Sequence, residues 1–286
     1  RCAIVTGVQT CALPISTGRD RWHEKSLFQE RGIPTARFAA VDSRADLEAA
    51  VADIGLPAVL KTRTMGYDGK GQAVLRGAAD VAPAWEQLGG VPLILEQMVD
   101  FRREVSMVAV RGRDGDKRFY PLSENHHEQG ILRESRARPG DPCEADAAAY
   151  AGRLLDRLGY VGTIALELFD TGDGLVANEM APRVHNSGHW TIEGAETSQF
   201  ENHLRAVLGL PLGATDPVGA SAMLNLIGAL PERGEVLAVP GAHLHFYDKT
   251  PRPGRKVGHI TLRADSADRL EAGLDRLRPA VSPHPA

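Results

Sequence analysis

The most informative stretch of this chain is the run from Asn178 to His189. It places Glu179, Arg183, two histidines and two asparagines directly after an apolar, strand-like segment. If these polar groups were buried, each would need a partner of its own, so the run cannot belong to a hydrophobic core. This composition indicates a binding or catalytic site.

A second carboxylate, Glu167, is placed to join this run through a β-hairpin. Residues 163–170 and 175–180 have the pattern of two strands, and the Thr-Gly-Asp-Gly sequence between them is typical of a turn. Centring the hairpin on Asp173 pairs Glu167 with Glu179 on one face, with their Cβ atoms about 5 Å apart.

Two like charges placed in this way are destabilising unless a cation lies between them. Carboxylate oxygens together with substrate phosphates are typical ligands of Mg²⁺, and Mn²⁺ is the alternative ion. Two solvated glutamates on an exposed face, or a register shifted by one residue, are the alternatives to a metal site.

A glycine-rich segment from Gly66 to Gln72 follows an apolar strand expected at 57–61. Its glycines let a backbone approach a phosphate closely, and Lys61 and Lys70 supply positive charge. The segment matches neither the Walker pattern nor the dinucleotide fingerprint, so a flexible hairpin tip is the alternative. Lys61 is less easily explained in that way, because a lysine at the end of a buried strand needs a partner.

Three further polar clusters are candidate ligand-binding sites. The strand expected at 92–98 ends in polar residues, and its edge together with Glu104 could hold an adenine and a ribose. The cluster at 125–128 (Asn-His-His-Glu) is either a surface loop or a ligand contact. Four cations lie within the eight residues 249–256, where Pro and Gly hold the turn, which favours an anion site over solvated charge.

Composition narrows the class of protein. The chain has 286 residues, of which 43% are hydrophobic and 24% charged, as in one large globular domain or two smaller ones. A net charge of -4 argues against a nucleic-acid partner, and no apolar run approaches the roughly 20 residues that a membrane span needs. Three scattered cysteines indicate neither a disulfide framework nor a zinc site, so a cytoplasmic location is expected.

The helices and strands that position these residues do not follow the strand-helix-strand order of a parallel sheet. Hairpins mixed with helices indicate an α+β fold rather than a doubly wound parallel sheet. Residues 211–219 read as a linker, and residues 1–16, which show neither a strand nor a helix period, are expected to be foreign to the fold. Helices are expected at 20–31, 45–54, 81–88, 146–158, 199–208 and from 266, and further strands at 104–111, 118–122, 222–227, 243–247 and 257–262.

The segments 66–72, 178–189 and 252–259, in this order, resemble the N5-carboxyaminoimidazole ribonucleotide synthase family of purine biosynthesis. The resemblance covers roughly residue 20 to the end. It implies an ATP-grasp fold, in which two α+β subdomains clasp ATP (residues 17–210), and a small C-terminal α+β domain (217–286). It also implies a reaction: ATP, bicarbonate and 5-aminoimidazole ribonucleotide give the N5-carboxylated product, ADP and phosphate, through carboxyphosphate.

The resemblance further implies a role for each matching residue. The ATP phosphates would contact Lys61, Gly66, Tyr67, Asp68, Gly69, Lys70, Gly71, Gln72 and His127. The adenine would be lined by Glu96, Gln97, Met98 and Val99, and the ribose held by Glu104. Glu167 and Glu179 would hold Mg²⁺, assisted by Asn178. The catalytic residues that position bicarbonate and carboxyphosphate would be Arg183, His185 and Asn186. The ribonucleotide would be held by Tyr67, Asp68, Lys70, Lys249, Arg255 and Lys256.

The chain departs from that family in one large respect. Family members begin with a nucleotide-fold domain of roughly a hundred residues, and here residues 1–16 stand in its place. We therefore expect a missing pre-ATP-grasp domain, a shortened carboxyl end and an incomplete substrate site; the family's homodimer is a further expectation. The alternatives are a related ATP-grasp ligase, such as a formate-dependent glycinamide ribonucleotide transformylase or a biotin-dependent carboxylase subunit, an ATP-binding fragment without catalysis, and an inert α+β domain.

Overall fold

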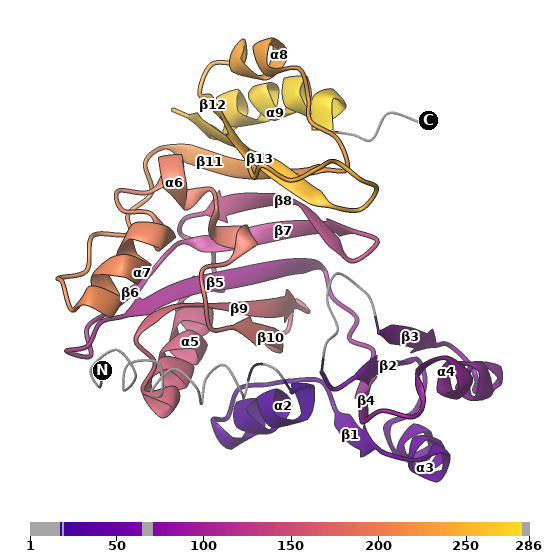
Figure 1. Cartoon of the computed structure of the whole chain (residues 1–286). Helices are drawn as coiled ribbons and strands as arrows, with labels where there is room; N and C mark the ends of the chain where they lie inside the picture. The colour runs from indigo at the N-terminus through magenta and orange to yellow at the C-terminus, as the bar shows by residue number, and fades with distance from the viewer. Residues whose placement is uncertain (1–17, 19, 65–70, 282–286) are drawn as a thin grey trace, which may run out of the picture.

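The chain folds into two antiparallel sheets with helices packed against them (Figure 1). The computed structural model describes Gly18, residues 20–64 and residues 71–281. In this described part every pairing between strands is antiparallel, which agrees with the predicted α+β class. Within it no helix is both long and apolar enough to cross a bilayer.

The smaller unit is a four-stranded sheet, at the lower right of Figure 1. In spatial order its strands are β1 (Phe38–Val41), β4 (Leu93–Gln97), β2 (Ala58–Thr62) and β3 (Gln72–Leu75). The helices that share its apolar core are α3 (Arg44–Ile54) and α4 (Val81–Leu88), the second preceded by the short helix η1 (Ala78–Asp80). The glycine-rich segment joins β2 to β3, and its residues 66–70 lie outside the described part of the chain.

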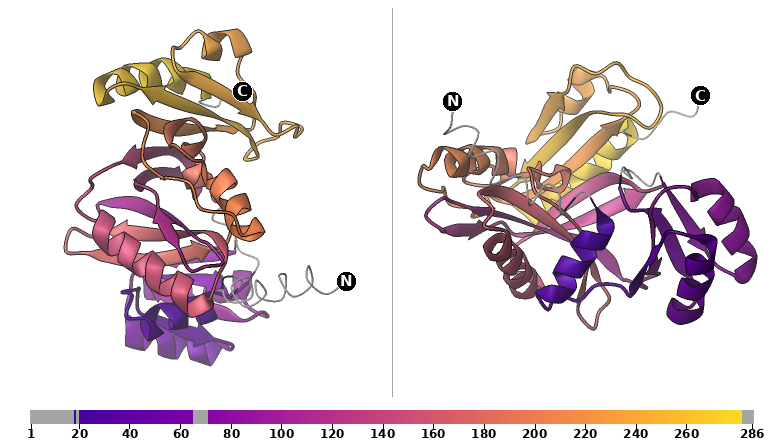
Figure 2. Two further views of the ribbon diagram at one scale, coloured as in Figure 1. Left: turned by 90° about the vertical axis from the view of Figure 1, so that its left-hand side faces the viewer. Right: turned by 60° about the horizontal axis from the view of Figure 1, so that its bottom comes forward.

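The larger sheet runs through the rest of the molecule. Its spatial order is β10 (Leu175–Ala181), β9 (Gly162–Asp170), β5 (Arg103–Arg111), β7 (Leu122–Glu128), β8 (Ile131–Arg138), β11 (Ala220–Ile227), β13 (Lys256–Ala264) and β12 (Ala242–Phe246), with β6 (Lys117–Phe119) paired to β5. Because β11 pairs with β8, the sheet continues from the middle of the chain into its C-terminal part without a break (Figure 2).

The two faces of this sheet carry different layers. Successive residues of a strand point to opposite faces. Ile164 and Leu166 of β9 pack with α2 (Arg21–Glu30) and α5 (Glu144–Leu158), whereas Ala165 packs near Trp190 on the other face. The elements that follow β10 are η2 (Asn186–Gly188), α6 (Thr191–Gly194) and α7 (Gln199–Leu208), and the C-terminal strands carry α8 (Arg233–Leu237) and α9 (Ala267–Val281). Glu167 therefore lies on the face of η2, opposite the apolar core under α5.

The predicted helices are confirmed: each begins within two residues of its expected start, and the five with a predicted end finish within two residues of it. Asp20 caps α2 as expected, because its side chain accepts hydrogen bonds from the backbone amides of Trp22 and His23. The prediction of strands was less complete. Strands β1, β3 and β8 were not expected, and the single strand predicted at 118–122 is divided between β6 and β7.

The cluster at 125–128 is not a surface loop but the end of β7, paired with β8. Strand β8 was not predicted because four of its eight residues are charged (Ile-Leu-Arg-Glu-Ser-Arg-Ala-Arg) and only two are buried. It lacks the apolar alternation by which a half-buried strand is usually identified.

Candidate active site

The acidic hairpin brings Glu167 and Glu179 directly opposite each other, as predicted. The route to that pairing differs from the prediction. Leu175 pairs with Asp170, so the turn comprises the four residues 171–174 and is not centred on Asp173. The register then shifts between Ala177 and Glu179, and this shift restores the expected pair of glutamates.

Asn178 is the extra residue in this register shift, a β-bulge in β10. A bulge leaves one residue outside the ladder and turns its side chain away from the regular alternation, which is common beside active sites. Here the bulge has a definite consequence: without it, Glu179 would move by one position relative to Glu167. Asn178 therefore sets the geometry of the acidic pair, whatever else its amide contacts.

The two carboxylates differ in their electrostatic surroundings. Burial raises the pKa of Glu179, and the negative charge of Glu167 raises it further, although its side chain remains accessible to solvent. Burial also raises the pKa of Glu167, but the hydrogen bond from His185 and the nearby charge of Lys256 outweigh it, so the pKa of Glu167 lies below its usual value. The pair therefore combines one stabilised carboxylate, Glu167, with one whose neighbouring cations, Arg21 and Lys61, do not offset its burial.

His185 ends the loop after β10 and faces the acidic pair. Its Nε2 lies 3.0 Å from Oε1 of Glu167, and its Nδ1 lies 2.9 Å from the hydroxyl of Ser187. The side chain also caps η2, because Nδ1 accepts from the backbone amide of Ser187. The predicted catalytic histidine is thus brought together with a predicted metal ligand.

The two neighbours of His185 in the motif are placed differently. The guanidinium of Arg183 is exposed and donates to the carbonyl of Val184 at 3.0 Å, which leaves it open to a ligand on the solvent side. Asn186 is engaged with Asn225 of β11: each side-chain amide donates to the carbonyl oxygen of the other, at 3.0 and 2.6 Å. Asn186 therefore links the loop after β10 to the C-terminal strands.

Lys61 has the partner that its burial required. Its Nζ lies 3.1 Å from Oε2 of Glu96 on the adjacent strand, and Lys25 of α2 reaches the same oxygen at 3.3 Å. Burial raises the pKa of Glu96, but the two lysines outweigh it and lower the pKa below its usual value. The side chain of Glu96 thus lies beside two cations, and its contact with an adenine remains a prediction.

The other predicted adenine contacts lie at the end of β4. The backbone amide of Gln97 donates to the carbonyl of Arg37, and that of Met98 donates to the carbonyl of Pro57 at 3.2 Å. The side chain of Met98 is exposed and that of Val99 is half-buried, so both are accessible to a ligand such as an adenine.

Of the glycine-rich segment, only Gly71 and Gln72 lie within the described residues; Gly66, Tyr67, Asp68, Gly69 and Lys70 lie outside them. Gly71 has a positive φ of 71°, and a Cβ there would come within 2.7 Å of the Thr62 hydroxyl. This position accepts only glycine without rearrangement. Gln72 pairs with Lys61 across the hairpin, so the glycine-rich segment directly follows β2, the strand that carries this lysine.

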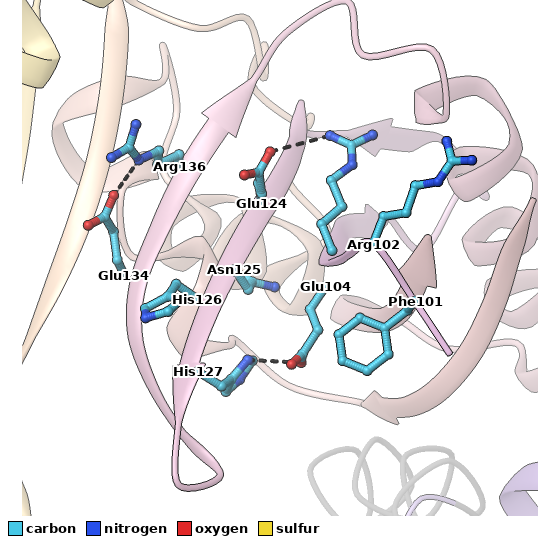
Figure 3. A pocket seen from close by; sticks show the side chains of 10 residues that line it. Phe101, Arg102, Glu104, Glu124, Asn125, His126, His127, Glu134 and Arg136 are labelled. Carbon is cyan, nitrogen blue, oxygen red and sulfur yellow. Dashed lines mark hydrogen bonds and ion pairs between the residues drawn. The ribbon is translucent and has the colours of Figure 1, made fainter. Parts of the chain in front are cut away.

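Glu104 and His127 meet across β5 and β7 at the edge of a pocket of about 390 Å³ (Figure 3). The Glu104 Oε2 and His127 Nδ1 atoms are 2.9 Å apart, an ion pair rather than an aligned hydrogen bond. Burial lowers the pKa of His127, but the charges of Glu104 and Glu167 outweigh it and raise the pKa above its usual value. His127 is therefore cationic at a lower energetic cost than a free histidine, which suits contact with phosphate.

The basic turn at 249–256 reaches the same region through one residue. The charge of Lys256, at the start of β13, acts on both Glu167 and His127. Lys249 instead lies over the ring of Tyr247, 5.1 Å from its centroid, and Arg255 donates to the carbonyl of Thr250 at 3.3 Å. Lys256 is thus brought to the acidic hairpin, whereas Lys249 and Arg255 are held within the turn.

Sequence reasoning missed three residues of helix α2. Arg21 donates to the carbonyl of Thr62 at 2.9 Å and its charge acts on Glu179, while Glu24 accepts from the backbone amide of Met180 at 2.5 Å. Burial and the charge of Glu179 raise the pKa of Glu24 well above its usual value. The signal was present: Arg21, Glu24 and Lys25 share one helical face with Phe28, where apolar side chains are expected.

Beside η2 lies a cluster of histidines that the sequence did not reveal. The rings of His245 and His259 stack with centroids 4.4 Å apart, and His189 packs against His259 at 4.9 Å. His245 Nε2 lies 3.0 Å from Glu193, and the Tyr247 hydroxyl lies 2.7 Å from Nδ1 of His259. Burial, reinforced by the other histidines of the cluster, lowers the pKa of His259 to about 2, so the ring is neutral at physiological pH.

This cluster predicts a sensitivity to acid. Because an unfolded histidine binds a proton below about pH 6.5 and folded His259 does not, the unfolded state gains protons as the pH falls. Stability is therefore retained above pH 6.5 and lost below it, by at most about 1.4 kcal/mol per pH unit from this residue. His259→Asn, which offers Tyr247 an oxygen in place of Nδ1, should flatten the dependence of Tm on pH between 6.5 and 4.

Thermal unfolding followed by circular dichroism across this pH range measures the effect. His126→Asn is the matched control, because the side chain of His126 is 67% exposed and should leave the pH profile unchanged. An equal slope in wild type and His259→Asn would contradict the assignment.

Comparisons with known proteins identify the family of this fold. Residues 26–200 match the family model of the ATP-grasp domain, and residues 221–273 match that of the phosphoribosylaminoimidazole carboxylase C-terminal domain. The chain is 63% identical over 256 residues to the N5-carboxyaminoimidazole ribonucleotide synthase of Pseudomonas aeruginosa, covering 90% of this chain and 71% of that protein. It is 45% identical over 266 residues to the Escherichia coli protein of the same name, covering 92% of this chain and 74% of that protein.

Solved structures lead to the same fold. The N5-carboxyaminoimidazole ribonucleotide synthetase of Thermus thermophilus superimposes with a TM-score of 0.90 at 56% identity, covering 96% of this chain and 76% of that one. The Aspergillus clavatus synthase in complex with ADP and 5-aminoimidazole ribonucleotide gives a TM-score of 0.86 at 32% identity, covering 93% of this chain and 74% of that one. The expected ATP-grasp fold is thereby confirmed. On these relatives and on the two matched domains, the chain belongs to the N5-carboxyaminoimidazole ribonucleotide synthase family, ATP-dependent ligases that carboxylate 5-aminoimidazole ribonucleotide with bicarbonate in purine biosynthesis.

Proposed function

We propose that this chain performs its family's carboxylation with Mg²⁺·ATP held between the acidic hairpin and the strand of Lys61. The observation that carries the proposal is the opposed pair of Glu167 and Glu179, with His185 at one of its carboxylates. Cationic residues from three distant parts of the chain act on this pair electrostatically, namely Arg21, Lys61 and Lys256. An acidic pair ringed by cations suits a site where a metal and several phosphates meet.

The residues present fit Mg²⁺. The acidic pair supplies oxygen ligands, and burial and the charge of Glu167 raise the pKa of Glu179, a repulsion that a divalent cation between the two carboxylates would relieve. Within the described ranges, no group of three or more His, Cys, Asp or Glu is placed to hold a metal ion. Two carboxylates completed by substrate phosphates are nevertheless a common Mg²⁺ arrangement. When bound, the ion would neutralise phosphate charge and orient the γ-phosphoryl group.

The chain's own residues prepare the other partners for reaction. Lys61 and His127, with the glycine-rich segment, would hold the phosphates by positive charge and backbone amides. Arg183, whose guanidinium is exposed beside His185, would bind bicarbonate and keep it close to the γ-phosphate. Bicarbonate is a poor electrophile, and phosphorylation converts one of its oxygens into a leaving group. Catalysis then depends on position and on charge stabilisation.

The second substrate would approach from the C-terminal strands. The Aspergillus clavatus relative is described in complex with ADP and 5-aminoimidazole ribonucleotide. In this chain Lys256, helped by Lys249 and Arg255, would bind the phosphate of the ribonucleotide and direct its amine towards carboxyphosphate. We place this substrate between an ATP-grasp domain at 17–210 and a C-terminal domain at 217–286.

Oxygen transfer tests the proposed chemistry. With [¹⁸O]bicarbonate, ATP, Mg²⁺ and 5-aminoimidazole ribonucleotide, the released phosphate should carry one ¹⁸O atom, because a bicarbonate oxygen attacks the γ-phosphorus and leaves with it. Mass spectrometry of the phosphate measures the label. Unlabelled phosphate released at the same rate as ADP would show simple ATP hydrolysis and would contradict carboxyphosphate formation. The same assay with formate and glycinamide ribonucleotide in place of bicarbonate and 5-aminoimidazole ribonucleotide tests the transformylase alternative.

Substitution at the basic turn tests the second substrate. Lys256→Ala should raise the KM for 5-aminoimidazole ribonucleotide by about tenfold or more, as loss of a charge-assisted contact worth at least about 1.4 kcal/mol implies. Arg252→Ala, in the same turn, is the control with a smaller change. An unchanged KM in Lys256→Ala, measured by ADP release at saturating ATP, would place the ribonucleotide elsewhere.

A further inference from the structure

A line of buried hydroxyl and amide groups runs from His185 across the large sheet. Ser187 lies 2.9 Å from His185 Nδ1, and Ser106 of β5 donates to Ser187 at 2.7 Å. Asn125 of β7 donates to Ser106 at 3.1 Å, and Ser135 of β8 donates to Asn125 at 2.7 Å. The three serines are fully buried and Asn125 is 8% exposed, so each group depends on the next for its hydrogen bond.

The directions of these hydrogen bonds follow from one backbone group. The amide of Ser187 can only donate, and its acceptor is Nδ1 of His185 at 3.3 Å, so that nitrogen carries a lone pair. The Ser187 hydroxyl then also donates to Nδ1 and must accept from Ser106. Ser106 in turn must accept from Asn125, which presents its NH₂ to Ser106 and its carbonyl oxygen to Ser135. Every proton in the line therefore points towards His185.

The contact of Nε2, at the other end of the imidazole, also shows which nitrogen carries the proton. Nε2 of His185 lies 3.0 Å from a carboxylate oxygen of Glu167. A carboxylate accepts hydrogen bonds, so this nitrogen carries the proton. Donors at Nδ1 and an acceptor at Nε2 select one tautomer, the neutral Nε2–H imidazole.

We propose that the line from Ser135 through Asn125, Ser106 and Ser187 fixes His185 as the Nε2–H tautomer, so that its N–H holds the carboxylate of Glu167 in place. The four residues are positioning residues, because the hydrogen bonds that link them reach Glu167 only through His185. The proposal deepens the function proposed above and rests on it for the role of Glu167. Partners that orient a metal ligand in this way typically contribute 10–100-fold to metal affinity or activity.

Nitrogen NMR of ¹⁵N-histidine-labelled protein tests the tautomer without any reaction. In the wild type His185 should show a protonated Nε2 and an unprotonated, hydrogen-bonded Nδ1. In Ser187→Ala the Nδ1 signal should move towards that of a nitrogen with weaker hydrogen bonding, and Ser106→Ala should give a smaller change. A wild-type spectrum with the proton on Nδ1, or a spectrum that Ser187→Ala leaves unchanged, would overturn the proposal.

The positioning of Glu167 is tested by Mn²⁺ affinity and by steady-state kinetics. Ser187→Ala should weaken Mn²⁺ binding in the presence of a non-hydrolysable ATP analogue by 10–100-fold, measured by electron paramagnetic resonance, and raise the KM for Mg²⁺·ATP with a smaller effect on kcat. His185→Gln, whose amide can donate at the place of Nε2, should retain more Mn²⁺ affinity than His185→Asn. Equal losses in the two variants would contradict a role for the Nε2–H donor.

Ser123→Ala is the matched control. Ser123 is a fully buried serine of the same sheet, but its hydroxyl accepts from the indole of Trp190 at 2.8 Å and has no hydrogen bond to this line. Its loss should lower Tm without changing the His185 spectrum or Mn²⁺ affinity. If Glu179→Gln left Mn²⁺ affinity intact, the metal site itself would be wrong, whereas an altered His185 spectrum in Ser187→Ala with intact Mn²⁺ affinity would refute only the positioning of Glu167.

Discussion

Glu179→Gln is expected to abolish measurable turnover, a loss on the order of 10³-fold in kcat, with no loss of thermal stability. The amide occupies the same space as the carboxylate but cannot balance a divalent cation. The fold should not suffer, because the pKa of Glu179 is raised by burial and by the charge of Glu167. A neutral side chain removes that repulsion.

Steady-state ADP release and differential scanning fluorimetry measure the two halves of this prediction. With Mg²⁺·ATP the wild type should gain thermal stability, and Glu179→Gln should gain much less, because ligand binding stabilises the folded state in proportion to affinity. Asp173→Asn, an equivalent change in the exposed turn of the same hairpin, should behave as the wild type does. Wild-type turnover in Glu179→Gln would refute the metal assignment.

The pairing on which this prediction depends shows how sequence reasoning succeeds for an incomplete reason. Alternating apolar residues and a Gly-containing turn were sufficient to identify the hairpin. The predicted turn was centred on Asp173, whereas the observed turn is centred between residues 172 and 173. The bulge at Asn178 compensated for this difference. A bulge has no reliable pattern in a single sequence, because its cause is the surroundings of the strand rather than its composition.

The parts of the site that sequence reasoning missed are those where charge takes the place of apolar residues. Helix α2 places Arg21, Glu24 and Lys25 on its inner face, and Lys25 is only 2% exposed. Period-based prediction assigns such residues to solvent. Only the distant partners explain them, and these partners, Glu96 and the backbone around Ala177, belong to strands far along the chain.

The histidine cluster and the serine line were missed for a related reason. His189, His245 and His259 meet only because β12 and β13 pair beside α6, a contact between distant segments. The motifs nevertheless contained residues that meet in the fold. Glu167, Glu179, His185 and Lys256 were each singled out from local patterns or from resemblance, and they interact electrostatically in the folded chain.

The second large effect is expected at Glu96, where the fold and the site share one carboxylate. Its Oε2 lies 3.3 Å from Nζ of Lys25 and 3.1 Å from Nζ of Lys61, and its side chain is 4% exposed. Lys25 also donates to the carbonyl of Ala177 at 3.2 Å, so this cluster joins α2 and the small sheet to the acidic hairpin. Glu96→Gln would leave the buried ammonium group of Lys25 and the half-buried one of Lys61 without a compensating charge.

We expect Glu96→Gln to lower the free energy of unfolding by about 3–5 kcal/mol, because removing one partner leaves an uncompensated buried charge. The pH dependence follows from the sign of the shift. Since the pKa of Glu96 is lowered in the folded state, its contribution is present above its unfolded pKa, near 4.5, and is lost as the pH falls through the lower folded value. The difference between wild type and variant should therefore shrink under acid conditions.

A double-mutant cycle in urea separates this charge effect from simple truncation. Lys25→Met in the Glu96→Gln background should recover part of the lost stability, because it removes one of the two opposed cations, and the two single changes should then be strongly non-additive. Glu48→Gln is the control: its pair with Arg44 has both side chains more than half exposed and should contribute less than about 1 kcal/mol. Additive effects of Lys25→Met and Glu96→Gln would show that the two residues are not coupled and would contradict the charge cluster as the link between α2 and the small sheet.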